Sequence, residues 1–494
     1  MRTQNKIFWG AAVLSLALGM TTRVGAEPMP ASTFDQLLEQ ELASGQGLTA
    51  DDAAREAERT SPNRRARSAE LGAAVAEVDR ATLAYLPTTT LTARYARLSE
   101  VSGGSLGNLV GVPAGTPAGV IAPGTPLVNV PVKFDTPLNQ YTFQASLLVP
   151  VSDYFLRVAP NRDAAKLGRD AAEAAVNFAK LRTAADARLA YYAWVNAKLR
   201  VVVAEQALGQ ARAHLKDTKA MLAAGTVSQA DVLRVESLVA KGELMRATSQ
   251  TLCELTEEQL RVTMHAPDRR AFHIGEDIRL PTSAASHPPL VTLFGEALAS
   301  RPDLAALDAA QGARGRSIAL DRAAYVPRVD LFADAQYSNP NPRVFPAQAE
   351  FRGSWDAGAQ LTWTLSDLPA AAARVSASEA RYEAKAAERA ELVDRIRLEV
   401  TKAREDSEVA RVALETTARG LAAAEESYRA RNLLFQNGRA TTLELIDSET
   451  DLTGARLEAL GARIDTRAAE VRLAYALGRD NQLDAPTTQH QVRR

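Results

Sequence analysis

The stretch AYLPTTTL at residues 84–91 returns as AYVPRVDL at residues 324–331, and this duplication decides the fold. The Tyr and the Pro of the two copies are separated by the same 240 residues. Matches continue downstream in the same order, Ser152-Asp153 with Ser366-Asp367 and Gly225 with Gly438. Self-similarity in a fixed order is the signature of a repeated structural unit. The sequence therefore predicts two structural repeats, at 48–266 and 290–480.

Each repeat is expected to contribute two strands that flank a loop. In 355–365, large or apolar residues alternate with small or polar ones, and period-2 runs of about ten residues are typical of membrane-barrel strands. A half-buried strand of a soluble sheet has the same period, so that alternative stays open. The expected segments are strand 88–98, extracellular loop 99–140 and strand 141–151 in repeat 1, and strand 328–337, loop 338–354 and strand 355–365 in repeat 2.

A very long helical pattern follows the second strand of each repeat. Residues 161–223 contain no proline and much alanine, and a helix of that length extends on the order of 95 Å. A Gly break near 225 or 438 then precedes a second helix. The sequence predicts antiparallel helical hairpins at 161–264 and 370–477, with Ser228 and Thr441 as N-caps.

The remaining segments are short. Residues 1–26 carry a basic start, an apolar run and small residues before Glu27, which is the layout of a cleavable signal peptide and predicts export. Residues 27–47 are expected to be an N-terminal linker, 267–289 an inter-repeat linker and 481–494 a disordered tail.

Composition excludes several functions. The chain has 58 basic and 59 acidic residues among 494, so it offers no field that would attract nucleic acid. Its one cysteine, Cys253, cannot form an internal disulfide, and its five histidines match no zinc or catalytic motif. We expect no enzyme activity, no cofactor and no metal site.

Four strands cannot close a membrane barrel, because bacterial barrels begin at eight strands and an open edge in lipid leaves backbone groups unpaired. Several chains must therefore contribute strands to one barrel. Two copies would give eight strands and three would give twelve, and the wider barrel suits the long hairpins.

The arrangement resembles the TolC-type outer-membrane efflux protein family. The resemblance is carried by the duplicated Tyr-x-Pro strand starts, the Ser-Asp elements and the two hairpin tips, AGTVSQADVL at 224–233 and NGRATTLELID at 437–447. It implies a mainly α fold with a membrane β-barrel portion, in which long antiparallel hairpins form a periplasmic tunnel below a trimeric 12-stranded barrel. The implied location is the outer membrane of a Gram-negative bacterium, with the tunnel extending into the periplasm.

The resemblance also implies a function and partners. The protein would be the exit duct of a tripartite efflux pump, passing small molecules outward as a homotrimer in outer-membrane lipid. It would dock with a periplasmic adaptor (membrane fusion protein) and an inner-membrane pump of the RND, MFS or ABC type. Two alternatives remain: the outer-membrane component of a type I protein secretion system, or, in a different class, a periplasmic coiled-coil scaffold or adaptor without a barrel.

The resemblance places functional residues at the tips. Glu444 and Asp447, six and nine positions after the tip glycine, would line a cation-attracting pore gate. The alternative is that Glu444 only caps its helix and Asp447 lies on a solvated face. Asp231 and Arg439 are candidates for a link between neighbouring hairpins. The expected adaptor contacts are Gly225, Thr226 and Val227 in repeat 1 and Gly438, Arg439 and Ala440 in repeat 2.

Overall fold

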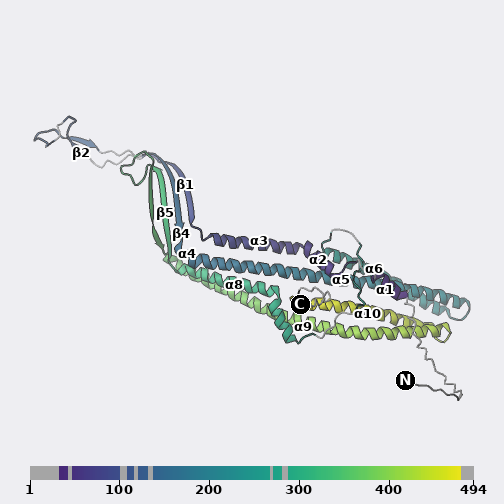
Figure 1. The fold of residues 1–494 in the computed structure, drawn as a ribbon. Coiled ribbons are helices and arrows are strands. Elements are labelled where there is room, and N and C mark those ends of the chain that lie inside the picture. Colours follow the sequence, from purple (N-terminus) through teal and green to yellow (C-terminus); the bar gives the residue numbers. More distant parts are fainter. Residues whose placement is uncertain are drawn as a thin grey trace, which may run out of the picture.

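The computed structural model describes residues 33–42, 47–100, 108–115, 119, 121–131, 137–266, 271–280 and 287–479. The expected signal peptide at 1–26 and the tail at 481–494 lie outside these residues. The strands form one end of the molecule and the two hairpin tips form the other, with long helices between them (Figure 1).

Both repeats contribute to one antiparallel sheet. It consists of β1 (Thr88–Arg97), β4 (Asn139–Val149), β5 (Arg328–Asn339) and β6 (Arg352–Thr362), in the order β1-β4-β5-β6. The repeats meet where β4 pairs with β5 along its length, from Tyr141 opposite Asn339 to Val149 opposite Leu331. The strands β1 and β6 are each paired on one side only.

Three expectations for the strand region differ from the structure. The strand expected at 141–151 lies at 139–149, because Pro150 follows it and Val151 already begins a short helix, α4 (Val151–Asp153). The strand expected at 355–365 lies at 352–362, because its ladder with β5 ends where Thr362 faces Arg328, the residue after Pro327. Proline has no backbone N–H to extend a ladder. The loop expected at 99–140 also contains a short hairpin, β2 (Asn108–Gly111) and β3 (Val128–Pro131), whose four-residue strands are too short for an alternation pattern to reveal.

Four helices build the two hairpins. They are α5 (Ala159–Ala223) with α6 (Gln229–Thr263), and α9 (Leu368–Gln436) with α10 (Thr442–Ala476). At 65 and 69 residues, α5 and α9 extend about 100 Å each. None of the described helices combines the length and the hydropathy that a membrane crossing requires.

The helices next to the sheet keep the order of the strands. The helix α3 (Pro62–Leu83) leads into β1 and packs on α5, which follows β4. The helix α8 (Pro302–Arg322) leads into β5 and packs between α5 and α9, which follows β6. The helical layer α3-α5-α8-α9 thus continues the layer β1-β4-β5-β6.

One difference between the repeats is a π-helical turn. The stretch from Ser152 to Gly225 is one residue longer than the matching stretch from Ser366 to Gly438. Residues Tyr154–Val158 form a π-helix (η1) just before α5. Because a π turn holds more residues than an α turn, it absorbs the extra residue without shifting the rest of the helix.

The main core forms a belt around the middle of α5. Trp194, Tyr191 and Tyr192 are fully buried there, with Leu38 and Leu42 packed against the same cluster. The last two belong to helix α1 (Thr33–Leu42), so the expectation of a plain linker at 27–47 is wrong. Sequence reasoning missed this helix because ten residues carry little periodic signal, and its apolar side depends on α5 for burial.

A second part of the belt ties the two linkers together. Leu48, just before α2 (Ala50–Thr60), forms a parallel bridge with Ile274 of the segment between the repeats. Glu276 fixes the same place, because it accepts hydrogen bonds from the Ala50 backbone N–H (2.6 Å) and from the Tyr192 hydroxyl (3.2 Å). Gly275 permits this close approach, since a Cβ there would overlap the Gly47 carbonyl group.

Gly275→Ala should therefore destabilise the protein by about 1–3 kcal/mol, through overlap of the new methyl group with the facing backbone. The measurement is the midpoint of thermal unfolding by circular dichroism. Gly209→Ala is the matched control, because a Cβ at Gly209 within α5 meets nothing within 4 Å. A midpoint unchanged by Gly275→Ala would contradict this account of the belt.

Candidate transport path

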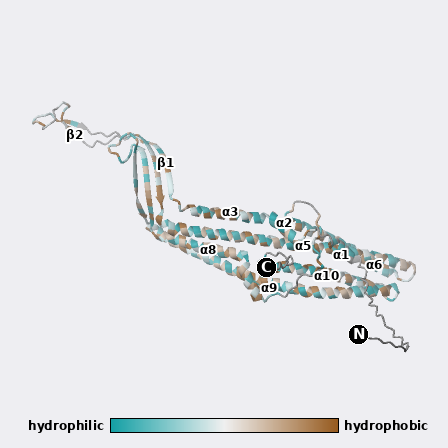
Figure 2. Cartoon of the chain, viewed as in Figure 1, coloured by the Kyte–Doolittle hydropathy of each residue, from teal (hydrophilic) through white to brown (hydrophobic). Residues whose placement is uncertain are grey.

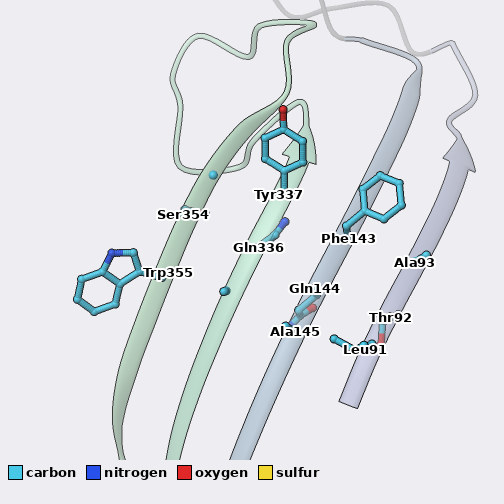
Figure 3. Close-up of a pocket in the computed structure, with 12 residues that line it drawn as sticks. Leu91, Thr92, Ala93, Phe143, Gln144, Ala145, Gln336, Tyr337, Ser354 and Trp355 are labelled. Atoms are coloured by element: carbon cyan, nitrogen blue, oxygen red, sulfur yellow. The ribbon is translucent and has the colours of Figure 1, made fainter. Parts of the chain in front are cut away.

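One face of the sheet is apolar and exposed. Leu91, Phe143, Tyr337 and Trp355 come from four different strands and line a shallow groove on this face (Figure 3). Leu91 is 80% exposed and Trp355 is 73% exposed. In a soluble protein, apolar residues on one face of a sheet pack into the core, whereas in a membrane barrel they face the lipid.

The other face of the sheet is polar. Asp334 of β5 accepts hydrogen bonds there from Ser146 (2.5 Å) and from Gln144 (3.1 Å) of β4. Figure 2 shows hydrophobic and hydrophilic residues interleaved along the strands. The sheet thus separates an apolar surface from a polar one, as the wall of an aqueous channel does.

Aromatic side chains mark both ends of the apolar face. Tyr95 packs against Tyr141 with ring centroids 5.0 Å apart, and Phe351 stacks on Tyr337 at 5.2 Å, at the end nearest β2. Aromatic rings of this kind concentrate at membrane–water interfaces. At the opposite end, Tyr85 stacks on Tyr154 at 5.8 Å.

The lateral surfaces of the chain are open. Besides the free edges of β1 and β6, the flanking helix α3 has only Ala81 buried. A helix that is exposed nearly all round gains little stability from its own chain. These surfaces lie on the two sides where further copies could continue the same layers.

Both hairpin tips use the same devices. Gly225 and Gly438 have φ of 75° and 70°, a left-handed conformation that ends α5 and α9 with the hydrogen bonds of a Schellman motif. Ser228 and Thr441 then start α6 and α10 as N-caps of complete capping boxes. The predicted N-caps are thereby confirmed.

The two gate candidates lie in different environments. The Glu444 carboxylate is used within its own chain, because it accepts from the Thr441 backbone N–H (2.9 Å) and pairs with Arg431 (2.7 Å). The Thr441 N–H, followed by Arg431, lowers the pKa of Glu444. Asp447 is exposed and has no ion pair or hydrogen bond within the described chain. It lines a groove of about 910 Å³ between α6 and α10.

The link candidates also differ. Asp231 accepts from the Ser228 hydroxyl (2.6 Å) and lies 3.5 Å from Arg234, so it repeats the capping role of Glu444. Arg439 is exposed, and no side-chain interaction of it occurs among the described residues. Within a single chain nothing joins Asp231 to Arg439.

The adaptor candidates occupy the turns themselves. Gly225, Thr226 and Val227 form the first turn and Gly438, Arg439 and Ala440 the second, all at the end of the molecule farthest from the sheet (Figure 1). Sequence reasoning missed Arg431, the partner of Glu444, because it lies on the other helix of the hairpin. Within the described ranges, no group of three His, Cys, Asp or Glu side chains is arranged to hold a metal.

Comparison with solved structures supports the architecture. The outer-membrane channel OprN superposes with a TM-score of 0.69 at 19% identity, over 90% of this chain and 91% of that one. The open-state MtrE outer membrane channel of Neisseria gonorrhoeae gives 0.69 at 18% identity, over 87% and 89%. CusC, described in terms of transmembrane channel formation, gives 0.69 at 16% identity, over 87% and 92%. No curated protein sequence gives a significant match.

These likenesses confirm the expected fold class, with a long helical tunnel and strands of a barrel that one chain does not close. The family model described as "Outer membrane efflux protein" matches residues 53–264 and 293–479, one segment in each repeat. Proteins of this family are channels and not enzymes. The chain therefore belongs to the outer membrane efflux protein family.

Proposed function

We propose that three copies of this chain form the exit duct of a tripartite efflux pump in the outer membrane of a Gram-negative bacterium. The observation that carries the proposal is a four-stranded sheet with one exposed apolar face, one polar face and two unpaired edges. In lipid, each unpaired backbone group costs several kcal/mol, so β6 of one copy must pair with β1 of the next. The apolar face would contact outer-membrane lipid.

The number of copies follows from the shape of the chain. Two copies would close a barrel of eight strands, and side chains fill the interior of a barrel of that size. Three copies would close a barrel of twelve strands, which leaves room for a transport path. The helices continue the strands in the same order, so closing the barrel also closes a tunnel. Small molecules would pass through it without chemical change.

The hairpin tips would receive the partners. A periplasmic adaptor would contact the two turns and connect the duct to an inner-membrane pump of the RND, MFS or ABC type. The pump would supply the energy and select the substrate. A type I secretion system would use the same duct, and an ATP-binding exporter as its genetic neighbour would favour that alternative.

Fractionation of cells that express the chain tests the proposal. The expected result is an outer-membrane species that migrates as a trimer in mild detergent and as a monomer after heating. A soluble periplasmic monomer would instead support the scaffold alternative and defeat the duct.

We propose further that Asp447 is the principal carboxylate of the periplasmic entrance, since the carboxylate of Glu444 is occupied by Thr441 and Arg431. Asp447→Asn should reduce cation-over-anion selectivity in planar bilayers by severalfold, because it removes an exposed charge from each copy. Glu444→Gln should change selectivity less, because Glu444 is already paired with Arg431 and a glutamine at this position can still complete the capping box with Thr441. Equal selectivity in Asp447→Asn and the wild type would contradict the assignment.

The tips carry a separate prediction. Gly438→Val should abolish export while trimers persist, because the φ of 70° disfavours a β-branched residue at the proposed docking turn. Gly420→Val, at an exposed helical position of α9, is the matched control and should retain export.

Arg439→Ala should instead raise the open probability, by removing the proposed link to Asp231 of a neighbouring copy. Normal export by Gly438→Val, or unchanged gating by Arg439→Ala, would refute the corresponding role.

A further inference from the structure

A buried carboxylate lies directly behind the proposed entrance. Glu449 of α10 is 3% exposed, although it follows the exposed Asp447 by only two residues. Neither of its carboxylate oxygens has a hydrogen-bond partner within the described chain. Buried polar groups are nearly always hydrogen-bonded, so this one requires an explanation.

A polar group of the other repeat lies beside this carboxylate. The His214 Nε2 atom of α5 lies 3.4 Å from a Glu449 oxygen, and the Tyr428 hydroxyl of α9 lies 3.4 Å from the same nitrogen. Glu449 thus sits where α10 packs against both long helices. The two hairpins are joined at this point by three titratable side chains.

Among the described residues, no arginine or lysine side chain forms an ion pair with this carboxylate, and His214 can do so only when it is protonated. Arg456, two turns along α10, donates to Gln206 of α5 at 3.0 Å. Titratable groups beside the site include His214 of α5 and Tyr428 of α9, and Asp217 acts electrostatically on His214. The adjoining groove is lined by Arg234 and Lys241 of α6 and by Asp447 and Asp451 of α10.

Burial therefore favours the uncharged form of both close partners. Loss of solvation raises the pKa of Glu449 from 4.5 to about 7, and it lowers the pKa of His214. For a carboxyl whose packed-state pKa is raised, the packed arrangement is fully favoured at low pH. That preference is lost as the pH rises from 4.5 through about 7.

We propose that Glu449 is a proton-operated switch of the periplasmic entrance. When the carboxyl group is protonated, α10 packs tightly against α5 and α9 and holds Asp447 at the closed entrance. When the proton leaves, the buried negative charge requires water, and the first turns of α10 separate from α5. The proposal rests on the proposed channel function and adds to it a pH at which the resting duct loosens.

The position of Glu449 supports this coupling. The buried residues at the start of α10 recur at helical spacing and include Leu445, Ser448 and Leu452 on either side of Glu449. A charge in that row acts on the same two turns that carry Glu444 and Asp447. A movement of α10 at Glu449 would therefore also shift the turns that carry the gate candidates.

The test is the open probability of the purified wild-type trimer in planar bilayers from pH 5 to pH 9. We expect the closed-to-open equilibrium to shift toward open by up to the order of 100-fold as the pH rises to about 7, and to change little above that pH. Glu449→Gln, which resembles the protonated form, should stay closed and lose this dependence.

Two further variants make the test specific. Glu470→Gln is the matched control, because the pKa of Glu470 on the same helix is also raised to about 7, far from the tip. It should keep the wild-type pH profile. His214→Gln places an amide donor beside the Glu449 carboxylate and should move the midpoint of the pH profile to lower pH. This variant still tests the switch if Glu449→Gln fails to assemble.

The outcomes separate the two proposals. A wild-type protein that forms no conducting trimer would defeat the proposed function and, with it, the switch. Conducting trimers with a flat pH profile would overturn the switch alone. So would a Glu449→Gln or a His214→Gln variant that keeps the wild-type midpoint.

Discussion

The unpaired edges of the four-stranded sheet are the constraint on which the rest of the structure depends. The outer edges of β1 and β6 carry backbone groups that find no hydrogen-bond partner within one chain. Because one face of the sheet is apolar and exposed, we expect these edges to lie in lipid, where unpaired backbone groups are costly. Each strand continues into one long helix, so the same closure applies to the helical layer. Barrel and tunnel are therefore one assembly, and neither is complete in a single copy.

The two repeats build this assembly from the same local features. Each repeat ends its first long helix with a left-handed glycine and starts the next with a capping box, and a single π turn at η1 absorbs the one extra residue of repeat 1. The repeats then diverge where function can differ. Repeat 2 places Glu444 at the capping position that Asp231 holds in repeat 1, and it alone follows with the exposed Asp447 and the buried Glu449.

Periodicity in the sequence was sufficient for the long helices, the four main strands and both tips, because each is encoded by a local pattern. It was insufficient for α1, which depends on burial against α5, and for the end of β6, which is set by a ladder that stops beside Pro327. For the site, the family resemblance identified two acidic residues after Gly438 but not their different surroundings. Arg431 and Glu449 escaped notice because their roles arise only when separate helices pack.

The central claim is that β6 of one copy pairs with β1 of the next in a closed ring of three. Within one chain these strands are separated by β4 and β5, about 14 Å apart, beyond the reach of a disulfide. In a Cys253→Ser background, Thr92→Cys can be combined in turn with Gly358→Cys, Gln360→Cys or Thr362→Cys and oxidised in the membrane. The account predicts that one combination yields a covalent trimer that resists heating, with no larger species. Monomers from every combination, or a ladder that extends past three copies, would contradict it.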